Sequence, residues 1–250
     1  MSSETSTPRQ VIAAWAVHAF TMTGVVCACL AVAALFAGDI RQMWLWLGVA
    51  LIVDGLDGTL ARKAQVSVHA PTFDGTTLDS VVDYLTWTFI PALFMYLHLP
   101  FGGPRIGLVA FIVITASSLF CYCNKRLKTE DYYFVGFPAA WNIVAVAMWL
   151  LGTGAVFNIV ATLVLAVLTL APITFVHPFR VGTLMVVNIV ATFAWVAATV
   201  GLVLTHPERP VWLELAWWVS GGWLMVISGW RSGQEMVRRW RTGRSVSSLG

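Results

Sequence analysis

The sequence predicts an all-α fold, a polytopic integral membrane bundle of about eight transmembrane helices with both termini in the cytoplasm. Of the 250 residues, 58% are hydrophobic and only 11% are charged, and the mean hydropathy is +0.79. A soluble domain carries roughly 25% charged residues, so this composition excludes a soluble enzyme and a disordered chain. The net charge of +3 is too small to indicate a nucleic-acid partner.

The apolar residues lie in uninterrupted runs that match the length of a membrane-crossing helix, about 20 residues. The connections between them are short and hold turn residues such as Gly38-Asp39 and His177-Pro178. Eight spans are expected near 11–36, 42–61, 78–97, 106–123, 137–152, 156–176, 182–204 and 211–229. We therefore expect a single membrane domain, 1–250, made of a cytoplasmic segment at 1–10, the transmembrane bundle at 11–229 and a basic cytoplasmic tail at 230–250.

The basic residues predict the orientation of this bundle. With the N-terminus inside, the inner loops and termini hold 12 of the 15 Lys and Arg residues, and the outer loops hold Arg41, Arg105 and Arg209. Cytoplasmic loops carry an excess of Lys and Arg in membrane proteins. The asymmetry favours eight spans, because a model with six or seven would place a basic cluster outside.

Four carboxylates lie in or beside two neighbouring spans, Asp54 and Asp57 in the second and Asp79 and Asp83 in the third. An ionised Asp at the centre of a span costs roughly 2.5–3.5 kcal/mol, and the two cations of Arg62-Lys63 cannot neutralise four of them. Each pair lies on one face of its helix, and the short loop between the spans makes the helices antiparallel. Both pairs can therefore meet at the same depth.

Converging carboxylate oxygens suit hard divalent cations, Mg²⁺ or Mn²⁺. Two such ions about 4 Å apart form a clamp for phosphoryl transfer, so we predict two divalent ions in one site. Gly58, Ala61 and Gly75 leave the helix faces open to a ligand, and Arg62 can bind a phosphate with two hydrogen bonds. Packing of helices through small residues is the other interpretation of Gly58 and Ala61.

In order along the chain the pattern reads Asp54-x-x-Asp57-Gly58-x-x-Ala61-Arg62, then 12 residues, then Gly75-x-x-x-Asp79-x-x-x-Asp83. It closely resembles the signature of the CDP-alcohol phosphotransferase family, integral membrane enzymes that join a CDP-activated donor to an alcohol and release CMP. The gap after Arg62 is longer than in most members. The longer gap, the eight expected spans, Phe134-Val-Gly-Phe-Pro138 and Trp141-Asn142 are similar to the bacterial phosphatidylcholine synthase branch.

The resemblance implies roles for the matching residues. The four Asp residues would bind the metal ions, and Asp83 would also be the general base, a choice over Asp79 that the spacing does not decide. His18 and Thr21 lie where many members carry Asn-x-x-Thr near the nucleotide, although His18 replaces the Asn and a core histidine is the alternative. The CDP pocket implied by the resemblance comprises Gly58, Ala61, Arg62, Gly75, Thr21 and His18.

The branch implies transfer of the phosphatidyl group of CDP-diacylglycerol to choline. Aromatic faces recognise a quaternary ammonium, and the candidates are Trp87, Tyr132 and Trp141, for each of which packing or interfacial anchoring is the alternative. Another acceptor, such as glycerol 3-phosphate or inositol phosphate, would need a basic pocket. The candidates for such a pocket are Lys125, Arg126, Lys128 and Arg180.

The expected setting is the inner membrane of a bacterium, with the active site facing the cytoplasm and the lipid bilayer, the two substrates and a second copy of the chain as partners. A cation transporter would also place Asp residues inside a membrane. Transporter sites usually lie near the midplane, whereas these carboxylates cluster beside one cytoplasmic loop, and the later spans hold no second copy of the pattern.

Overall fold

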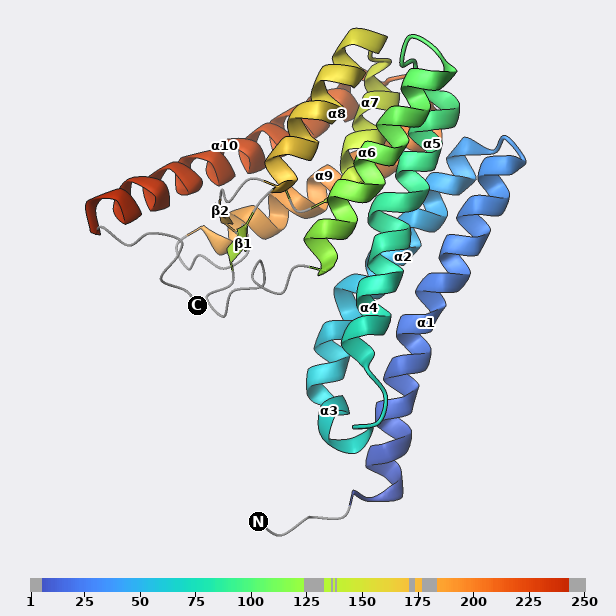
Figure 1. The fold of residues 1–250 in the computed structure, drawn as a ribbon, viewed down its shortest axis with the longest axis vertical. Coiled ribbons are helices and arrows are strands. Elements are labelled where there is room, and N and C mark those ends of the chain that lie inside the picture. Colours follow the sequence, from blue (N-terminus) through green and yellow to red (C-terminus); the bar gives the residue numbers. More distant parts are fainter. Residues whose placement is uncertain are drawn as a thin grey trace. The chain divides into compact units, whose positions relative to one another are not determined.

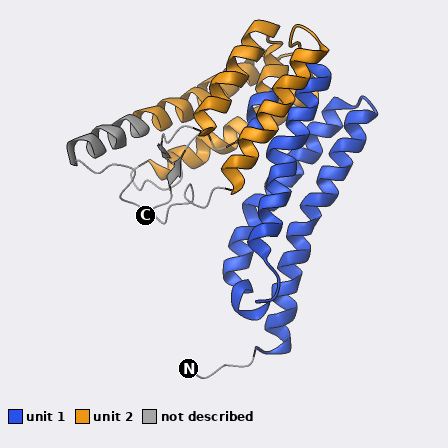
Figure 2. Ribbon diagram, viewed as in Figure 1, with its two compact units in different colours: residues 1–99, 141–146 blue, residues 100–140, 147–250 orange. Residues whose placement is uncertain are grey.

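In the computed structural model, the residues described are 6–123, 133–135, 137, 139–170, 174–176 and 184–242. They are overwhelmingly helical (Figure 1) and divide into two compact units (Figure 2). Unit 1 comprises residues 1–99 and 141–146, and unit 2 comprises residues 100–140 and 147–250. All the described candidate site residues lie in unit 1.

Unit 1 begins with a hairpin of two long helices, α1 (Pro8–Phe36) and α2 (Ile40–Lys63), which lie side by side (Figure 1). A capping box starts α1, in which the Thr7 side chain accepts a hydrogen bond from the Gln10 backbone and the Gln10 side chain accepts one from Thr7. Gly38 turns the chain with a φ of +77°, a conformation that favours glycine. Asp39 then caps α2.

The third apolar segment, Gly75–His98, is one continuous helical stretch with three parts. It consists of α4 (Gly75–Asp83), the π-helical turn η1 (Tyr84–Phe89) and α5 (Ile90–His98). Asp74 caps α4, because its carboxylate accepts hydrogen bonds from the backbone and the hydroxyl of Thr77. All three parts contact α1, so this segment lies beside the α1–α2 hairpin.

A short helix, α3 (Val66–His69), lies in the connection between α2 and α4. Val66 and the following Ala70 are buried against Ala14 of α1, and Ala61 of α2 packs against the same cluster. Gln65, in the left-handed conformation with a φ of +46°, separates α3 from α2. Part of the 12-residue connection between Arg62 and Gly75 therefore packs against the α1–α2 hairpin.

Unit 2 holds the later helices and one strand pair. The helices are α6 (Pro104–Cys123), most of α7 (Trp141–Leu151), α8 (Ala155–Leu170), α9 (Met185–Thr205) and α10 (Val211–Thr242). The strands β1 (Tyr133–Val135) and β2 (Thr174–Val176) pair antiparallel, with Phe134 opposite Phe175. Within the unit, α6 packs with α8 and α9 packs with α10.

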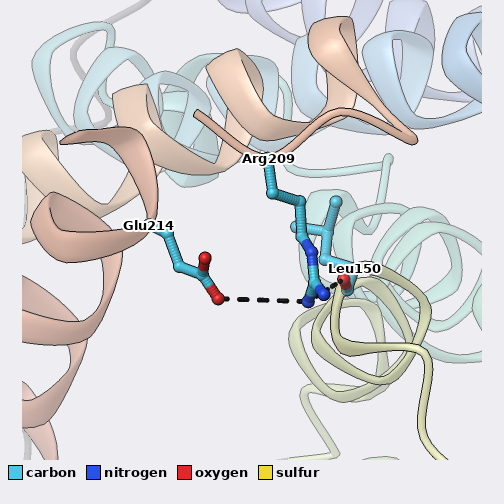
Figure 3. Close-up of polar contacts among 3 residues, drawn as sticks. All are labelled: Leu150, Arg209 and Glu214. Carbon is cyan, nitrogen blue, oxygen red and sulfur yellow. Dashed lines mark hydrogen bonds and ion pairs between the residues drawn. The ribbon is translucent and has the colours of Figure 1, made fainter. Parts of the chain in front are cut away.

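Polar contacts fix two connections of unit 2. Arg209 donates a hydrogen bond of 3.2 Å to the carbonyl of Leu150, near the end of α7, and lies 3.9 Å from Glu214 at the start of α10 (Figure 3). Asn158, which is fully buried, donates to the Pro100 carbonyl at 2.8 Å and accepts a hydrogen bond from Thr153. These side chains satisfy backbone and hydroxyl groups that have few other partners in an apolar setting.

The predicted all-α membrane fold is confirmed. Each of the eight expected spans coincides with a helical segment, and within the described residues six of these segments are long and apolar enough to cross a membrane. The exceptions are α7, with 11 residues, and α8, with 16. At about 1.5 Å per residue they reach about 16 and 24 Å, short of the roughly 30 Å hydrocarbon core. Eight full crossings therefore remain a prediction.

Three boundaries differ from the expected ones by four residues or more. Helix α7, in the fifth expected span, starts at Trp141, three residues after Pro138 in the sequence. Helix α8, in the sixth expected span, ends at Leu170, two residues before Pro172 in the sequence. Proline lacks the backbone N–H that a helix interior needs and disfavours helix at the residue before it. The last helix continues to Thr242, so the first part of the expected basic tail is helical.

Candidate functional site

Three carboxylates converge between α2 and α4. Asp54, Asp57 and Asp79 each offer one oxygen, and these oxygens all lie within 4.8 Å of one another. Asp57 is buried, and the other two are half-buried. The predicted meeting of Asp residues from the two spans is seen for these three residues, and the helical spacing of Asp54 and Asp57 on α2 contributes to it.

Asp83, one turn beyond Asp79, extends the cluster. Its side chain lies near the carboxyl groups of Asp54, Asp79 and Asp57. Its Oδ1 atom is buried and has no hydrogen-bond partner among the described residues. Carboxylates this close repel each other in a medium of low dielectric constant unless a proton or a cation lies between them.

This donor set fits a divalent cation. Carboxylate oxygens are the ligands that Mg²⁺ and Mn²⁺ prefer, and the three clustered oxygens are close enough to share one ion. Arg62 does not provide the counter-charge, because in the described part of the chain it forms no ion pair. It is exposed and donates a hydrogen bond of 3.1 Å to Thr59 on its own helix.

Gly58 and Arg62 share one face of α2. A Cβ atom at Gly58 would meet only the Arg62 guanidinium, at an ordinary contact distance of 3.5 Å. Tight helix packing therefore does not demand a glycine here, and the face stays accessible beside an exposed cation. Ala61 is different, because it packs against the Ala14, Val66 and Ala70 cluster that holds α3.

The space beside Gly75 is filled by His18 of α1. A Cβ atom at position 75 would lie only 2.7 Å from His18 Cε1. The imidazole is 3% exposed and packs against the rings of Phe73 and Trp15, at centroid distances of 4.5 and 5.7 Å. Its Nε2 atom is buried without a hydrogen-bond partner among the described residues. His18 thus has the packing of a core histidine and an uncommitted nitrogen as well.

Thr21, one turn further along α1, is buried and donates a hydrogen bond of 3.3 Å to the Val17 carbonyl. Gly24 is a residue that the sequence reasoning missed. A Cβ atom there would lie 2.5 Å from Cγ1 of Val82, so this glycine lets α1 approach α4. The signal is a buried stripe on α1 at helical spacing, Ala14, His18, Thr21, Gly24 and Ala28.

The three aromatic candidates for choline binding differ in burial and in the element that carries them. Trp87 lies on η1, four residues after Asp83, and is half-buried. Trp141 starts α7 and has no exposed surface. Tyr132 lies outside the described residues, as do the basic residues Lys125, Arg126, Lys128 and Arg180.

The fold and the site together define a class: an integral membrane protein with the carboxylate motif of a CDP-alcohol phosphotransferase-type enzyme on two neighbouring helices. No family model matches the sequence. The chain is 47% identical to a phosphatidylcholine synthase of Pseudomonas aeruginosa over 230 residues, which cover 92% of this chain and 96% of the relative.

Two further relatives bear the same name. Phosphatidylcholine synthases of Agrobacterium fabrum and Rhizobium johnstonii are 36% and 34% identical over 222 and 220 residues. These alignments cover 89% and 88% of this chain and 92% and 90% of the relatives. The chain therefore belongs to the phosphatidylcholine synthase family, and the predicted resemblance is confirmed.

Proposed function

We propose that this protein transfers the phosphatidyl group of CDP-diacylglycerol to choline and releases CMP, at a site that faces the cytoplasm from a bacterial inner membrane. The observation that carries this proposal is the cluster of Asp54, Asp57 and Asp79, whose oxygens lie within 4.8 Å of one another. The relatives' name supports choline as the acceptor. The residues predicted to bind glycerol 3-phosphate or inositol phosphate, Lys125, Arg126, Lys128 and Arg180, lie outside the described residues.

In this reaction the hydroxyl oxygen of choline forms a bond to the phosphorus that carries the diacylglycerol. The bond from that phosphorus to the oxygen of CMP breaks, CMP leaves with the electron pair, and the hydroxyl proton passes to a base. Asp83 is the base we propose, because its Oδ1 is buried, has no hydrogen-bond partner among the described residues and lies beside the cluster. Asp79, by contrast, supplies one of the three converging oxygens.

Divalent cations, Mn²⁺ or Mg²⁺ and two per site, would supply neutralisation of the pyrophosphate charge when bound. Asp54, Asp57 and Asp79 would hold them, with Asp83 completing the ligand set. Arg62, exposed beside the open face of Gly58, would orient a phosphate by paired hydrogen bonds. Each of these residues acts by binding and orienting the reacting groups.

The nucleotide would lie near Gly75, where α1 contributes His18 and Thr21. The buried Nε2 of His18 has no partner among the described residues and can bond a polar group of CDP. For choline, Trp87 is the foremost candidate, because it is half-buried and follows Asp83 by four residues on the same helical stretch. Trp141 has no exposed ring face and would need to become exposed first. Ala61 is the weakest pocket candidate, because it packs toward α3.

The test is CMP release by the purified protein in detergent, with CDP-diacylglycerol and Mn²⁺. Choline, ethanolamine, serine, inositol and glycerol 3-phosphate are supplied in parallel. Release with choline alone, abolished by EDTA, is expected. Release with a phosphorylated alcohol instead would refute choline as the acceptor. Asp83→Asn should lose turnover and keep CMP binding, with Asp39→Asn, at the cap of α2, as the matched control.

A further inference from the structure

Three aromatic rings, those of Trp15, His18 and Phe73, form a cluster beside the start of α4. Trp15 and His18 are three residues apart on α1 and are therefore neighbours on its surface, whereas Phe73 lies between α3 and α4. The ring centroids are 4.5 Å apart for His18 and Phe73, 5.4 Å for Trp15 and Phe73, and 5.7 Å for Trp15 and His18. The imidazole of His18 thus packs against two other rings.

Gly75 limits the imidazole on a further side. A Cβ atom at position 75 would lie 2.7 Å from Cε1 and 3.2 Å from Nδ1 of His18. The imidazole is also only 3% exposed. Because protein interiors are closely packed, these neighbours restrict the rotation of the ring about its side-chain bonds.

The backbone holds Phe73 in place against the imidazole. Its N–H donates a hydrogen bond of 3.2 Å to the Ala70 carbonyl, and its carbonyl accepts one of 3.1 Å from the N–H of Gly75. Ala70 is itself buried against Ala14 of α1. Phe73 is therefore anchored to α1 on one side and to the glycine of the motif on the other.

The restricted imidazole carries a nitrogen that has no partner. Nε2 of His18 is buried and forms no hydrogen bond with the described residues. Buried polar atoms in native proteins are nearly always paired, and an exception calls for an explanation such as a bound water or ion. A ring that could rotate freely would be able to turn this nitrogen toward a partner in the protein, and the packed rings oppose that rotation.

We infer that Phe73 is a positioning residue for nucleotide binding: together with Trp15 it holds the His18 ring so that Nε2 stays available to a polar group of the CDP moiety. The inference rests on the proposed function, in which His18 contributes to the nucleotide site. Phe73 lies outside the motif, in the 12-residue connection between Arg62 and Gly75. A group that is held in its binding orientation beforehand loses less conformational freedom when the ligand binds. Phe73 acts through His18 and needs no contact with the substrate.

Phe73→Leu removes the ring and keeps an apolar side chain, whereas Phe73→Tyr keeps the ring. The probe is CMP with Mg²⁺, titrated into the purified full-length protein in detergent and followed by calorimetry. We expect the dissociation constant for CMP to rise about 3–10-fold in Phe73→Leu, the loss of one ordinary hydrogen bond, and to stay near the wild-type value in Phe73→Tyr. The KM for CDP-diacylglycerol should rise in Phe73→Leu, and the KM for choline should not. Phe36→Leu, at an exposed phenylalanine of α1, is the matched control and should change none of these.

A double-mutant cycle separates positioning from direct contact with the nucleotide. His18→Ala should weaken CMP binding about 3–10-fold, and Phe73→Leu should have no further effect in that background. An equal loss from Phe73→Leu in both backgrounds, or an unchanged CMP affinity in Phe73→Leu, would overturn the positioning role and leave the proposed function intact.

A measurement on the wild type guards against a folding defect in Phe73→Leu. The imidazole ¹⁵N resonances that His18→Ala removes should shift when CMP and Mg²⁺ are added to the wild type. Absence of that shift in a protein that binds CMP would overturn the positioning role, whether or not Phe73→Leu folds. Absence of both CMP binding and CMP release from CDP-diacylglycerol in the wild type would overturn the proposed function as well.

Discussion

Gly75→Ala tests whether the glycine of the motif is required by His18. An alanine Cβ would lie 2.7 Å from Cε1 and 3.2 Å from Nδ1 of His18. Carbon atoms prefer separations of about 3.5–4.0 Å, so the imidazole or the start of α4 must retreat by about 1 Å. The imidazole has little room, because it is 3% exposed and packs against Phe73 and Trp15.

The expected cost follows from this crowding. Adding a methyl group to a well-packed site typically costs about 1–3 kcal/mol. For a chain of this size that loss lowers the unfolding temperature by about 2–12 °C. The measurement is a thermal unfolding scan in detergent at a fixed protein concentration. Gly48→Ala on α2 is the matched control, since no atom lies within 4 Å of its Cβ position. It should leave the unfolding temperature unchanged or raise it, because alanine favours helix by about 1 kcal/mol over glycine.

A double-mutant cycle identifies the atom responsible. If the His18 ring is the obstacle, Gly75→Ala should cost less than about 0.5 kcal/mol in the His18→Ala background, and the coupling should be about 1–2 kcal/mol. Equal losses of unfolding temperature in both backgrounds would refute the steric argument. The glycine would then be required by something other than His18, such as the bound nucleotide.

Three further predictions concern stability and metal binding. Gly24→Ala should lower the unfolding temperature, and Val82→Ala should restore it by removing the Cγ1 atom that lies 2.5 Å from the new Cβ; failure of the rescue would contradict the close contact. Mn²⁺ at about 100 times its dissociation constant should stabilise the wild type by about 2.7 kcal/mol, reversibly with EDTA, and Asp57→Asn should abolish the shift; a full shift in that variant would remove Asp57 from the ligand set. Asn158→Ala should cost about 1–3 kcal/mol, because it leaves the Pro100 carbonyl without its buried donor, while the KM for choline, measured by CMP release, stays unchanged.

The sequence was sufficient to predict the helices and the meeting of the carboxylates. Apolar runs of about 20 residues define the helices in lipid. The spacing of Asp54 and Asp57, and of Asp79 and Asp83, places each pair on one helix face. A connection of only 12 residues keeps the two helices near each other, and both pack on α1. These inferences use only the helical period and the reach of the chain.

The features that the sequence did not predict depend either on a local choice between α-helical and π-helical hydrogen bonds or on contacts between residues far apart in the chain. The π-helical turn after Asp83 adds hydrogen-bond geometry that hydrophobic periodicity does not encode. The strand pair β1–β2 joins residues about 40 positions apart, and each strand has only three residues. The contact of His18 with Gly75 joins two helices, so only the packed structure reveals that the glycine accommodates a ring of the protein.

The 12-residue gap shows how a departure from the family pattern is accommodated. The residues of the gap do not form a free loop. Val66 and Ala70 pack on Ala14, and Phe73 packs on His18. Asp74 caps α4. Each contact fixes backbone that a free loop would leave mobile, at a cost of about 1–2 kcal/mol per residue that the packing must offset. The start of α4 is thereby tied to α1, and the position of Asp79 one turn later is tied with it. The proposed metal ligands on α4 would thus be positioned by apolar residues of the gap.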